Sequence, residues 1–275
     1  QNGQSRPCFT RLIAACLTGA MVAFCLQPWH LFNGEFMARR FFDDQPFSHA
    51  VATELGANAS HHIGKVLRMA VGDAVTLFNG QGGEWSAQIT AISKKSVTVE
   101  PQVFTADNRT PPLNVTVALP MIKGDRMEYA IQKATELGAA TIVVLDTERC
   151  EVRLKGERAD KKIAHWQQVA VSACEQCGLN IPPLIEGTVE LKHWLNRDLP
   201  DLRLIAHPGE QPFDPGVLST TQNLALLTGP EGGFSDDELN AAQAAGFTPF
   251  ALGERVLRAE TAPVALLAAL WAWRG

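Results

Sequence analysis

Residues 223–239 read NLALLTGPEGGFSDDEL, and this stretch predicts a buried strand, a glycine loop and a new helix in direct succession. The apolar run 223–228 is typical of a strand that is covered on both faces. Ser235 and Glu238 have the spacing of a capping box, in which the serine caps a helix and the glutamate bonds back to the cap amide. This order places the loop at the carboxyl end of a parallel α/β sheet, where such sheets bind ligands.

The glycine loop in this stretch predicts a binding site for a ligand that carries little negative charge. Its sequence matches neither G-x-G-x-x-G nor G-x-x-x-x-G-K-[ST], the common glycine patterns for phosphates. Acidic residues at 236–238 would repel a phosphate from the helix start. Backbone groups can instead read the edge of a ligand; the alternative is a tight structural turn. The candidate cofactor-binding residues here are Thr228, Gly229, Pro230, Glu231, Gly232 and Gly233.

A second loop, LGERVLRAET at 252–261, predicts a site with charged side chains beside the start of another helix. It lies between a short strand and an apolar helix, with Thr261 as the cap and Pro263 in the first turn. Arg258 and Glu260 both adjoin that helix start, and the alternative is a solvated charged loop. The candidate cofactor-binding residues of this loop are Leu252, Gly253, Val256, Leu257, Arg258 and Thr261.

The chain alternates strands and helices from residue 113 onward. Gly138 and Gly246 follow two of the expected helices, at the position where a helix commonly ends. This alternation predicts a parallel α/β sheet that is covered by helices on both faces. The expected strands are 113–119, 141–145, 202–206, 223–228 and 248–252, and the expected helices are 125–137, one within 157–177, 236–245 and 262–273.

Residues 39–104 predict a smaller domain of short strands. A glycine-rich turn and the pair Lys94-Lys95 join these strands, which favours a small antiparallel barrel. One helical insertion is expected around 61–68. The polar segment 105–112 ends in two prolines and predicts a linker. The expected strands of the barrel are 74–78, 85–92 and 96–100.

The first 36 residues differ from the rest of the chain. Arg6 and Arg11 precede the apolar run 12–26, as in a signal peptide, but this run is shorter than the roughly 20 residues of a membrane-spanning helix. The alternative is an upstream extension, because Met37 directly precedes the expected start of the small domain. We expect a cytoplasmic protein without a membrane partner; a working export signal would contradict that expectation.

Composition places the chain among ordinary globular proteins. It has 275 residues, of which 46% are hydrophobic and 19% are charged, and this excludes disorder and coiled coils. Residues 200–254 hold eight acidic residues and one basic one, so the remainder carries +2 although the whole chain carries −5. The net charge therefore leaves room for a face that binds RNA. Six cysteines are too few for a disulfide scaffold, and no metal site is expected.

Several motifs, in order along the chain, resemble one protein family. GPEGGFSDDEL, LGERVLRAETAP, KGDRMEYAIQKATELG and SACEQCG resemble the RsmE family of small-subunit (16S) ribosomal RNA uracil-N3 methyltransferases, in the SPOUT superfamily. HHIGKVLRMAVGD and LFNGQGGEW resemble its PUA-like RNA-binding domain. The resemblance covers about residues 38–273. It implies a PUA-like β-barrel domain over 38–104, a linker over 105–112 and a SPOUT methyltransferase domain over 113–275, with residues 1–36 outside.

The resemblance also implies a cofactor and an assembly. The SPOUT domain is expected to be an α/β parallel sheet with a deep C-terminal trefoil knot, a topology that periodicity alone does not predict. S-adenosylmethionine is the expected methyl donor, held by the loops 228–233 and 252–261. Its sulfonium would tolerate nearby acidic side chains, which a pyrophosphate would not. A homodimer is expected, with the site near the dimer interface, and the expected partner is ribosomal RNA or the assembled small subunit.

Methylation at N3 of uracil sets the roles we expect at the site. Orientation of N3 against the methyl group should supply most of the catalytic gain. N3 carries a proton, and negative charge spreads onto the flanking carbonyl oxygens as that proton leaves. We expect Arg258 to stabilise that charge, and Glu260 or Glu231 to take the proton or position the base. N3 lies on the Watson–Crick edge, so the target uridine must be unpaired or flipped out.

Basic residues in two regions are the candidates for RNA contact. Four lie in the small domain and four near the expected sheet edge, and each one alone is more often a solvated surface charge. The candidates are Arg39, Arg40, Lys65, Arg68, Lys123, Arg126, Arg149 and Arg153.

One departure from the family leaves other functions open. The family commonly continues after Gly178 as Gly-Arg-Asn-Arg, whereas this chain reads Gly178-Leu179-Asn180-Ile181. One alternative is a non-catalytic RNA-binding or ribosome-assembly protein that kept the fold. Another is a SPOUT methyltransferase that acts on a different RNA or base position.

Overall fold

The computed structural model describes residues 39–207, 214–250 and 252–274, and the chain from Arg39 onward forms one compact unit. The expected extension over residues 1–36, with its apolar run, lies outside the described residues. Within the described ranges, no helix combines the length and apolar character needed to cross a membrane.

The C-terminal part builds a six-stranded sheet in which every strand is parallel to its neighbours. The strand order is β11-β9-β10-β6-β7-β8, which confirms the predicted parallel α/β sheet. The strands are β6 (Asn114–Pro120), β7 (Ala139–Asp146), β8 (Leu184–Glu190), β9 (Leu202–Ala206), β10 (Asn223–Leu227) and β11 (Thr248–Phe250).

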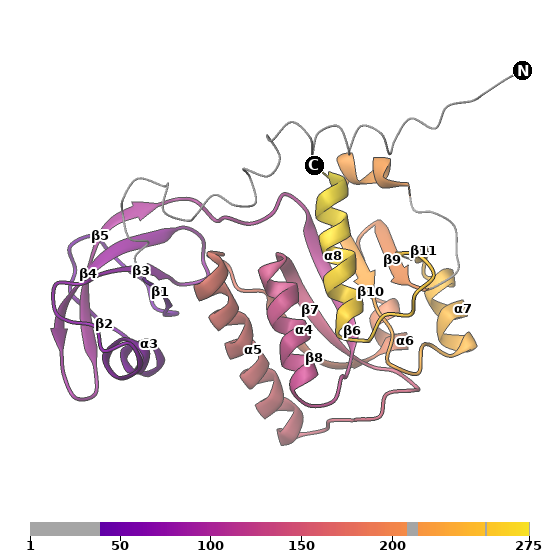
Figure 1. The fold of residues 1–275 in the computed structure, drawn as a ribbon, viewed down its shortest axis with the longest axis horizontal. Coiled ribbons are helices and arrows are strands. Elements are labelled where there is room, and N and C mark those ends of the chain that lie inside the picture. Colours follow the sequence, from indigo (N-terminus) through magenta and orange to yellow (C-terminus); the bar gives the residue numbers. More distant parts are fainter. Residues whose placement is uncertain (1–38, 208–213, 251, 275) are drawn as a thin grey trace, which may run out of the picture. The chain divides into compact units, whose positions relative to one another are not determined.

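Helices cover both faces of this sheet, because successive side chains of a strand point to opposite faces. On β10, Leu224 and Leu226 pack with α4, α5 and α8, whereas Ala225 and Leu227 pack with α6 and α7 (Figure 1). Both cores are closed to solvent, as the apolar sequence of β10 predicts. The helices are α4 (Asp125–Glu136), α5 (Glu157–Cys177), α6 (Leu191–Leu195), α7 (Asp236–Ala244) and α8 (Thr261–Arg274).

The direction in which strands are added reverses between β6 and β10. From β6 the chain adds β7 and then β8 on one side, whereas β10 pairs with β9 on the other side. Open α/β sheets bind ligands in the crevice at such a switch point. The trefoil knot that the resemblance implies is not tested by this strand order and stays a prediction.

A smaller sheet precedes the large one, in the order β1-β3-β4-β5-β2. The expected antiparallel arrangement is wrong for one pair, since β1 runs parallel to β3. The long connection between these two strands carries β2 and the helical insertion, and so it can return the chain to the same end of the sheet. The strands are β1 (Arg39–Phe42), β2 (Thr53–Glu54), β3 (Ala74–Phe78), β4 (Glu84–Ile92) and β5 (Val97–Thr105).

Some element bounds differ from the expected ones. The helical insertion begins earlier than expected, as α3 (Ala57–His61), and continues as a π-helical turn over His62–Val66. The sequence did not indicate β8, α6 or the short 3-10 helix at Pro215–Ser219. β8 lies at an edge of the sheet and most of its side chains are only partly buried, so it lacks the apolar run of a central strand. The last strand ends at Phe250 rather than at 252.

Arg40 lies inside the protein, where the small sheet meets the end of α5. Its side chain is 6% exposed, and its Nη1 lies 2.5 Å from Oε2 of Glu84. The guanidinium lies 5.0 Å from the ring centre of Phe78 and also donates to Oδ1 of Asn180. The expected RNA contact of Arg40 is therefore wrong, because its charge is paired and enclosed.

Leu179 stands where the family commonly has the first arginine after the helix. Its side chain is 8% exposed and packs with Phe78 and the buried Cys174. Arg109 pairs with Glu84 at 2.6 Å in the same region. Leu179 thus adds an apolar contact beneath the small sheet.

Candidate functional site

The two predicted loops meet at the carboxyl edge of the large sheet and enclose a cavity of about 330 Å³. The ends of β9 and β11 and the start of α8 complete its wall. This volume lies in the range of small-molecule sites. Eight of the predicted cofactor-binding residues line the cavity: Gly229, Pro230, Glu231, Gly233, Leu252, Gly253, Val256 and Leu257.

Four predicted cofactor-binding residues lie outside this lining: Thr228, Gly232, Arg258 and Thr261. Thr228 is fully buried directly before the loop, and Gly232 is exposed beside it. The side chains of Arg258 and Thr261 are also exposed. Sequence position alone therefore places the loops correctly but not every side chain within them.

Several residues that line the cavity were not among the cofactor-binding residues predicted from the sequence. His207 follows β9, Phe234 follows the glycine loop, and Arg255 lies within the second loop. Phe250 and Leu266 add apolar surface, and Arg149, which the sequence offered as an RNA contact, also reaches the cavity. Arg255 lies between residues that were predicted to bind the cofactor, and this position indicates that it also lines the cavity. The position of His207 after a strand end indicated its approach to the site, and the pairing of β9 with β11 brings Phe250 beside it.

The glycine loop needs its glycines for different reasons. A Cβ at Gly229 would lie 3.0 Å from the ring of Phe234, and one at Gly232 would lie 3.2 Å from Cβ of Arg149. Gly233 has room for a side chain, but its φ of +69° is unfavourable for other residues. Its amide closes a turn by donating to the carbonyl of Pro230 at 2.8 Å. The loop is therefore a tight turn with bare backbone facing the cavity.

The predicted capping box fixes the far end of the glycine loop. Oγ of Ser235 accepts a hydrogen bond from the amide of Glu238 at 3.2 Å, and Oε2 of Glu238 accepts one from the amide of Ser235 at 2.9 Å. Oε1 of Glu238 also accepts from the amide of Glu148, in the loop after β7, at 2.9 Å. This buried carboxylate therefore holds two neighbouring loops in register.

One arginine joins both loops to the large domain's first helix. Nη1 of Arg126, in the first turn of α4, lies 3.2 Å from Oε1 of Glu231 and 3.9 Å from Oε2 of Glu260. The Glu260 side chain is 10% exposed, whereas that of Glu231 is 37% exposed and lines the cavity. The expected RNA residue Arg126 thus lies among the expected catalytic residues.

Two buried polar atoms beside the cavity have no hydrogen-bond partner among the described residues. They are Oγ1 of Thr228 and Oε2 of Glu260. Burial of a polar group without a hydrogen-bond partner lowers the free energy of unfolding by about 1–3 kcal/mol, so such atoms are rare in native proteins. The amide of Thr228 is satisfied, because it donates to the carbonyl of Ala118 at 2.9 Å. Oγ1 of Thr228 is therefore suited to a ligand that brings a polar group to this edge of the sheet, whereas Oε2 of Glu260 lies 3.9 Å from Nη1 of Arg126.

The remaining candidates for RNA contact fall into two groups. Arg39, Lys65 and Arg68 are exposed on the small domain, and Lys123 is exposed at the start of α4. Arg149 donates to the carbonyl of Gly232 at 2.9 Å. The Nε of Arg153 lies 3.4 Å from Asp146. The first four keep free surface for a polyanion, whereas Arg149 and Arg153 are already paired within the protein.

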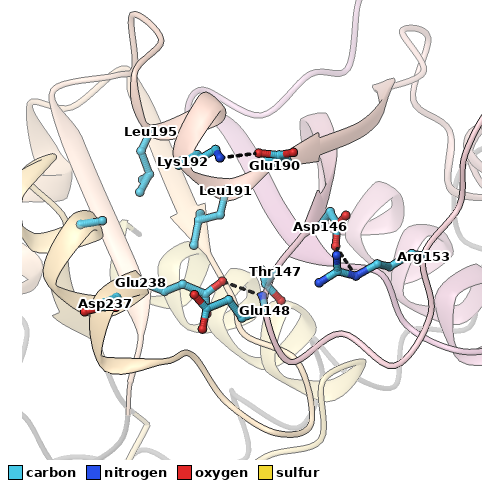
Figure 2. Close-up of a pocket in the computed structure, with 11 residues that line it drawn as sticks. Asp146, Thr147, Glu148, Arg153, Glu190, Leu191, Lys192, Leu195, Asp237 and Glu238 are labelled. Atoms are coloured by element: carbon cyan, nitrogen blue, oxygen red, sulfur yellow. Dashed lines mark hydrogen bonds and ion pairs between the residues drawn. The ribbon is translucent and has the colours of Figure 1, made fainter.

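A second cavity, of about 360 Å³, opens between the ends of β7 and β8 and the helices α6 and α7 (Figure 2). Its two cations are paired, Lys192 with Glu190 at 3.0 Å and Arg153 with Asp146. Glu238 in its wall serves the capping box. The carboxylates of Glu148 and Asp237 also line this cavity and pair with no cation among the described residues, so its lining is acidic.

Comparison with known proteins gives consistent results for both parts of the chain. Residues 109–271 match the RNA methyltransferase domain family, and residues 55–102 match the RNA methyltransferase PUA domain family. The chain is 33% identical over 211 residues to the ribosomal RNA small subunit methyltransferase E of Buchnera aphidicola. This alignment covers 76% of this chain and 83% of that relative.

Two solved structures are similar over most of the chain. The ribosomal RNA small subunit methyltransferase E of Neisseria gonorrhoeae, bound to S-adenosyl methionine, is 34% identical with a TM-score of 0.79, covering 86% of this chain and 97% of that one. A Legionella pneumophila protein, solved in complex with the bound cofactor SAM, is 38% identical with a TM-score of 0.82, covering 86% and 98%.

The capping box makes a prediction about stability. Ser235→Ala removes the side-chain acceptor for the amide of Glu238, and we expect the free energy of unfolding to fall by about 1 kcal/mol. Urea denaturation measures this difference. Ser172→Ala in the exposed middle of α5 is the control, with an expected change within about 0.5 kcal/mol. Equal losses in both variants would contradict the capping role.

Proposed function

The chain belongs to the ribosomal RNA small subunit methyltransferase E family, and we propose that it transfers a methyl group from S-adenosylmethionine to N3 of a specific uridine in small-subunit ribosomal RNA. The observation that carries this proposal is the cavity at the switch point of the sheet, which is lined by both predicted loops. Membership of the family favours this function over the alternative of a non-catalytic RNA-binding protein.

The cavity suits S-adenosylmethionine as its occupant. The bare backbone of Gly229 and Gly233 can bond the edge of an adenine, and Leu252, Val256 and Leu257 offer apolar surface. The unpaired hydroxyl of Thr228 provides a polar group next to the loop. When bound, the cofactor supplies the methyl group, which leaves its bonding electron pair on sulfur and forms a bond to N3.

The charged residues of the two loops have separate roles in this proposal. Glu231 lines the cavity, so its carboxylate takes the N3 proton. Arg258 is exposed on the second loop and pairs with no described residue, which leaves its guanidinium free to stabilise charge on the uracil oxygens. Glu260 is buried and does not line the cavity, so it acts through Arg126 rather than on the base.

The substrate is an unpaired or flipped-out uridine, because base pairing would cover N3. Arg39, Lys65 and Arg68 on the small domain and Lys123 just before α4 supply positive charge for the RNA backbone. Ribosomal RNA or the assembled small subunit is the partner, and the cytoplasm is the compartment that contains it.

The assembly and the division into domains are part of the proposal. The side chain of Val256 is 83% exposed and Leu257 is 37% exposed at the edge of the cavity. A second copy of the chain would cover such apolar groups, which supports a homodimer with the site at its interface. The proposed division is a small PUA-like domain over 38–104 and a SPOUT domain with a trefoil knot over 113–275.

Nucleoside analysis tests the function directly. Small subunits and free ribosomal RNA from a strain that lacks the family's enzyme are incubated with the protein and S-adenosylmethionine, then digested for mass spectrometry. We expect N3-methyluridine to appear in the RNA only when the protein and S-adenosylmethionine are both present. Methyl groups on another base or atom would favour the different-target alternative. Absence of any transfer, with no heat of cofactor binding in calorimetry, would favour the non-catalytic alternative.

The role of Arg258 makes a second prediction. Arg258→Ala removes the guanidinium that the proposal assigns to the charge on the uracil oxygens, and we expect kcat to fall about 100-fold. The Kd for S-adenosylmethionine should change less than about threefold, because this side chain does not line the cavity. Arg158→Ala, at an exposed position of α5, is the control. Normal turnover of Arg258→Ala with intact cofactor binding would exclude the role.

A further inference from the structure

Among the described residues of α4, Arg126 pairs with a carboxylate on each of the two loops of the cavity. α4 follows β6, and the glycine loop follows β10, so the 3.2 Å pair between Arg126 and Glu231 spans the switch point of the sheet. The 3.9 Å pair with Glu260 adds the loop that precedes α8. Three segments that are distant in sequence therefore converge on one guanidinium.

The local backbone aims Arg126 at this point. Gly124 caps α4 with a φ of +69° and a ψ of −147°, a conformation that other residues rarely adopt. No atom lies within 4 Å of a Cβ built at Gly124, so the backbone angle rather than space requires the glycine here. The chain thus turns sharply out of β6, and the first turn of α4 begins at the edge of the sheet.

Glu260 depends on Arg126 more than Glu231 does. Its Oε2 is buried and accepts no hydrogen bond from the described residues, and Arg126 is the only cation paired with it there. A buried carboxylate without a nearby positive charge is costly. Glu260 and Arg126 therefore stabilise each other. The same guanidinium also pairs with the carboxylate of Glu231, which lines the cavity.

We infer that Arg126 is a positioning residue: anchored by Glu260, it holds the carboxylate of Glu231 in the orientation that accepts the substrate proton. This inference rests on the proposed function. It assigns Arg126 to the proton-transfer machinery instead of to the RNA backbone. The N3–H bond breaks, its electron pair stays on nitrogen to form the bond to carbon, and the proton adds to Glu231.

The charges of this cluster suit the reaction. Two carboxylates and one guanidinium give a formal charge of −1, which is the complement of a sulfonium. Uptake of the proton by Glu231 neutralises the cluster at the same time as the sulfonium becomes a neutral thioether. The cluster and the sulfonium together thus carry no net formal charge before or after transfer, so neither state leaves an uncompensated charge between them.

The test separates positioning from structural and RNA-binding roles. Wild type, Arg126→Ala and Arg126→Lys are compared with Arg197→Ala, which removes an Arg–Glu pair of similar exposure outside the cavity, with Glu186 at 2.5 Å. We expect Arg126→Ala to lower kcat about 100-fold with each KM changed less than about threefold. Arg126→Lys should recover part of kcat, and Arg197→Ala should match wild type.

Binding and stability supply readouts that do not depend on turnover. Calorimetry should show that Arg126→Ala binds S-adenosylmethionine within about threefold of wild type. Urea denaturation should show lower stability for Arg126→Ala, because Glu260 is left buried without its cation. The double variant Arg126→Ala with Glu260→Gln should regain that stability but not kcat, because Glu231 still lacks its partner.

Each other outcome overturns the inference in a recognisable way. An unchanged kcat with a raised KM for RNA would make Arg126 an RNA contact. Recovery of kcat in the double variant would make the role purely structural. If wild type itself transfers no methyl group, the proposed function fails; if wild type is active and Arg126→Ala keeps its kcat, only this inference fails.

Discussion

The six strands of the large sheet all run parallel, and this constraint places every loop that follows a strand at one edge. The strand order reverses between β6 and β10, so the loops at that point diverge and leave a crevice. The glycine loop and the loop before α8 line this crevice, and Arg126 at the start of α4 pairs with a glutamate on each loop. The cavity, its charged cluster and its unpaired polar atoms exist because of this arrangement.

Charge is distributed around the crevice in a way that fits a cationic cofactor and a polyanionic substrate. Acidic residues start α7 and line the glycine loop, which disfavours a phosphate in the cavity itself. Exposed basic residues lie on the small domain and at the start of α4, and Arg149 and Arg255 also reach the cavity wall. In the proposed function these exposed charges attract the RNA backbone, and the acidic residues of the loops favour a sulfonium.

The sequence predicted the elements that carry a strong local signal. The helix within 157–177, the strand at 202–206 and the capping box at Ser235 match because each depends on residues close together in the chain. The edge strand β8 was missed, since its partly buried side chains carry no apolar run. The parallel pairing of β1 with β3 was also missed, because it depends on a distant partner.

The candidate site was predicted as two loops but not as an arrangement of side chains. Arg40 and Arg126 carried the same RNA assignment from the sequence, yet one is enclosed against Glu84 and the other joins Glu231 to Glu260. Such pairs join residues more than 40 positions apart, which no spacing rule predicts. The most direct test of the whole account is a crystal structure of the chain with S-adenosylmethionine. The account predicts the cofactor in the cavity between residues 228–234 and 252–257, with the hydroxyl of Thr228 newly hydrogen-bonded; a cofactor bound elsewhere, or none in that cavity at saturating concentration, would contradict it.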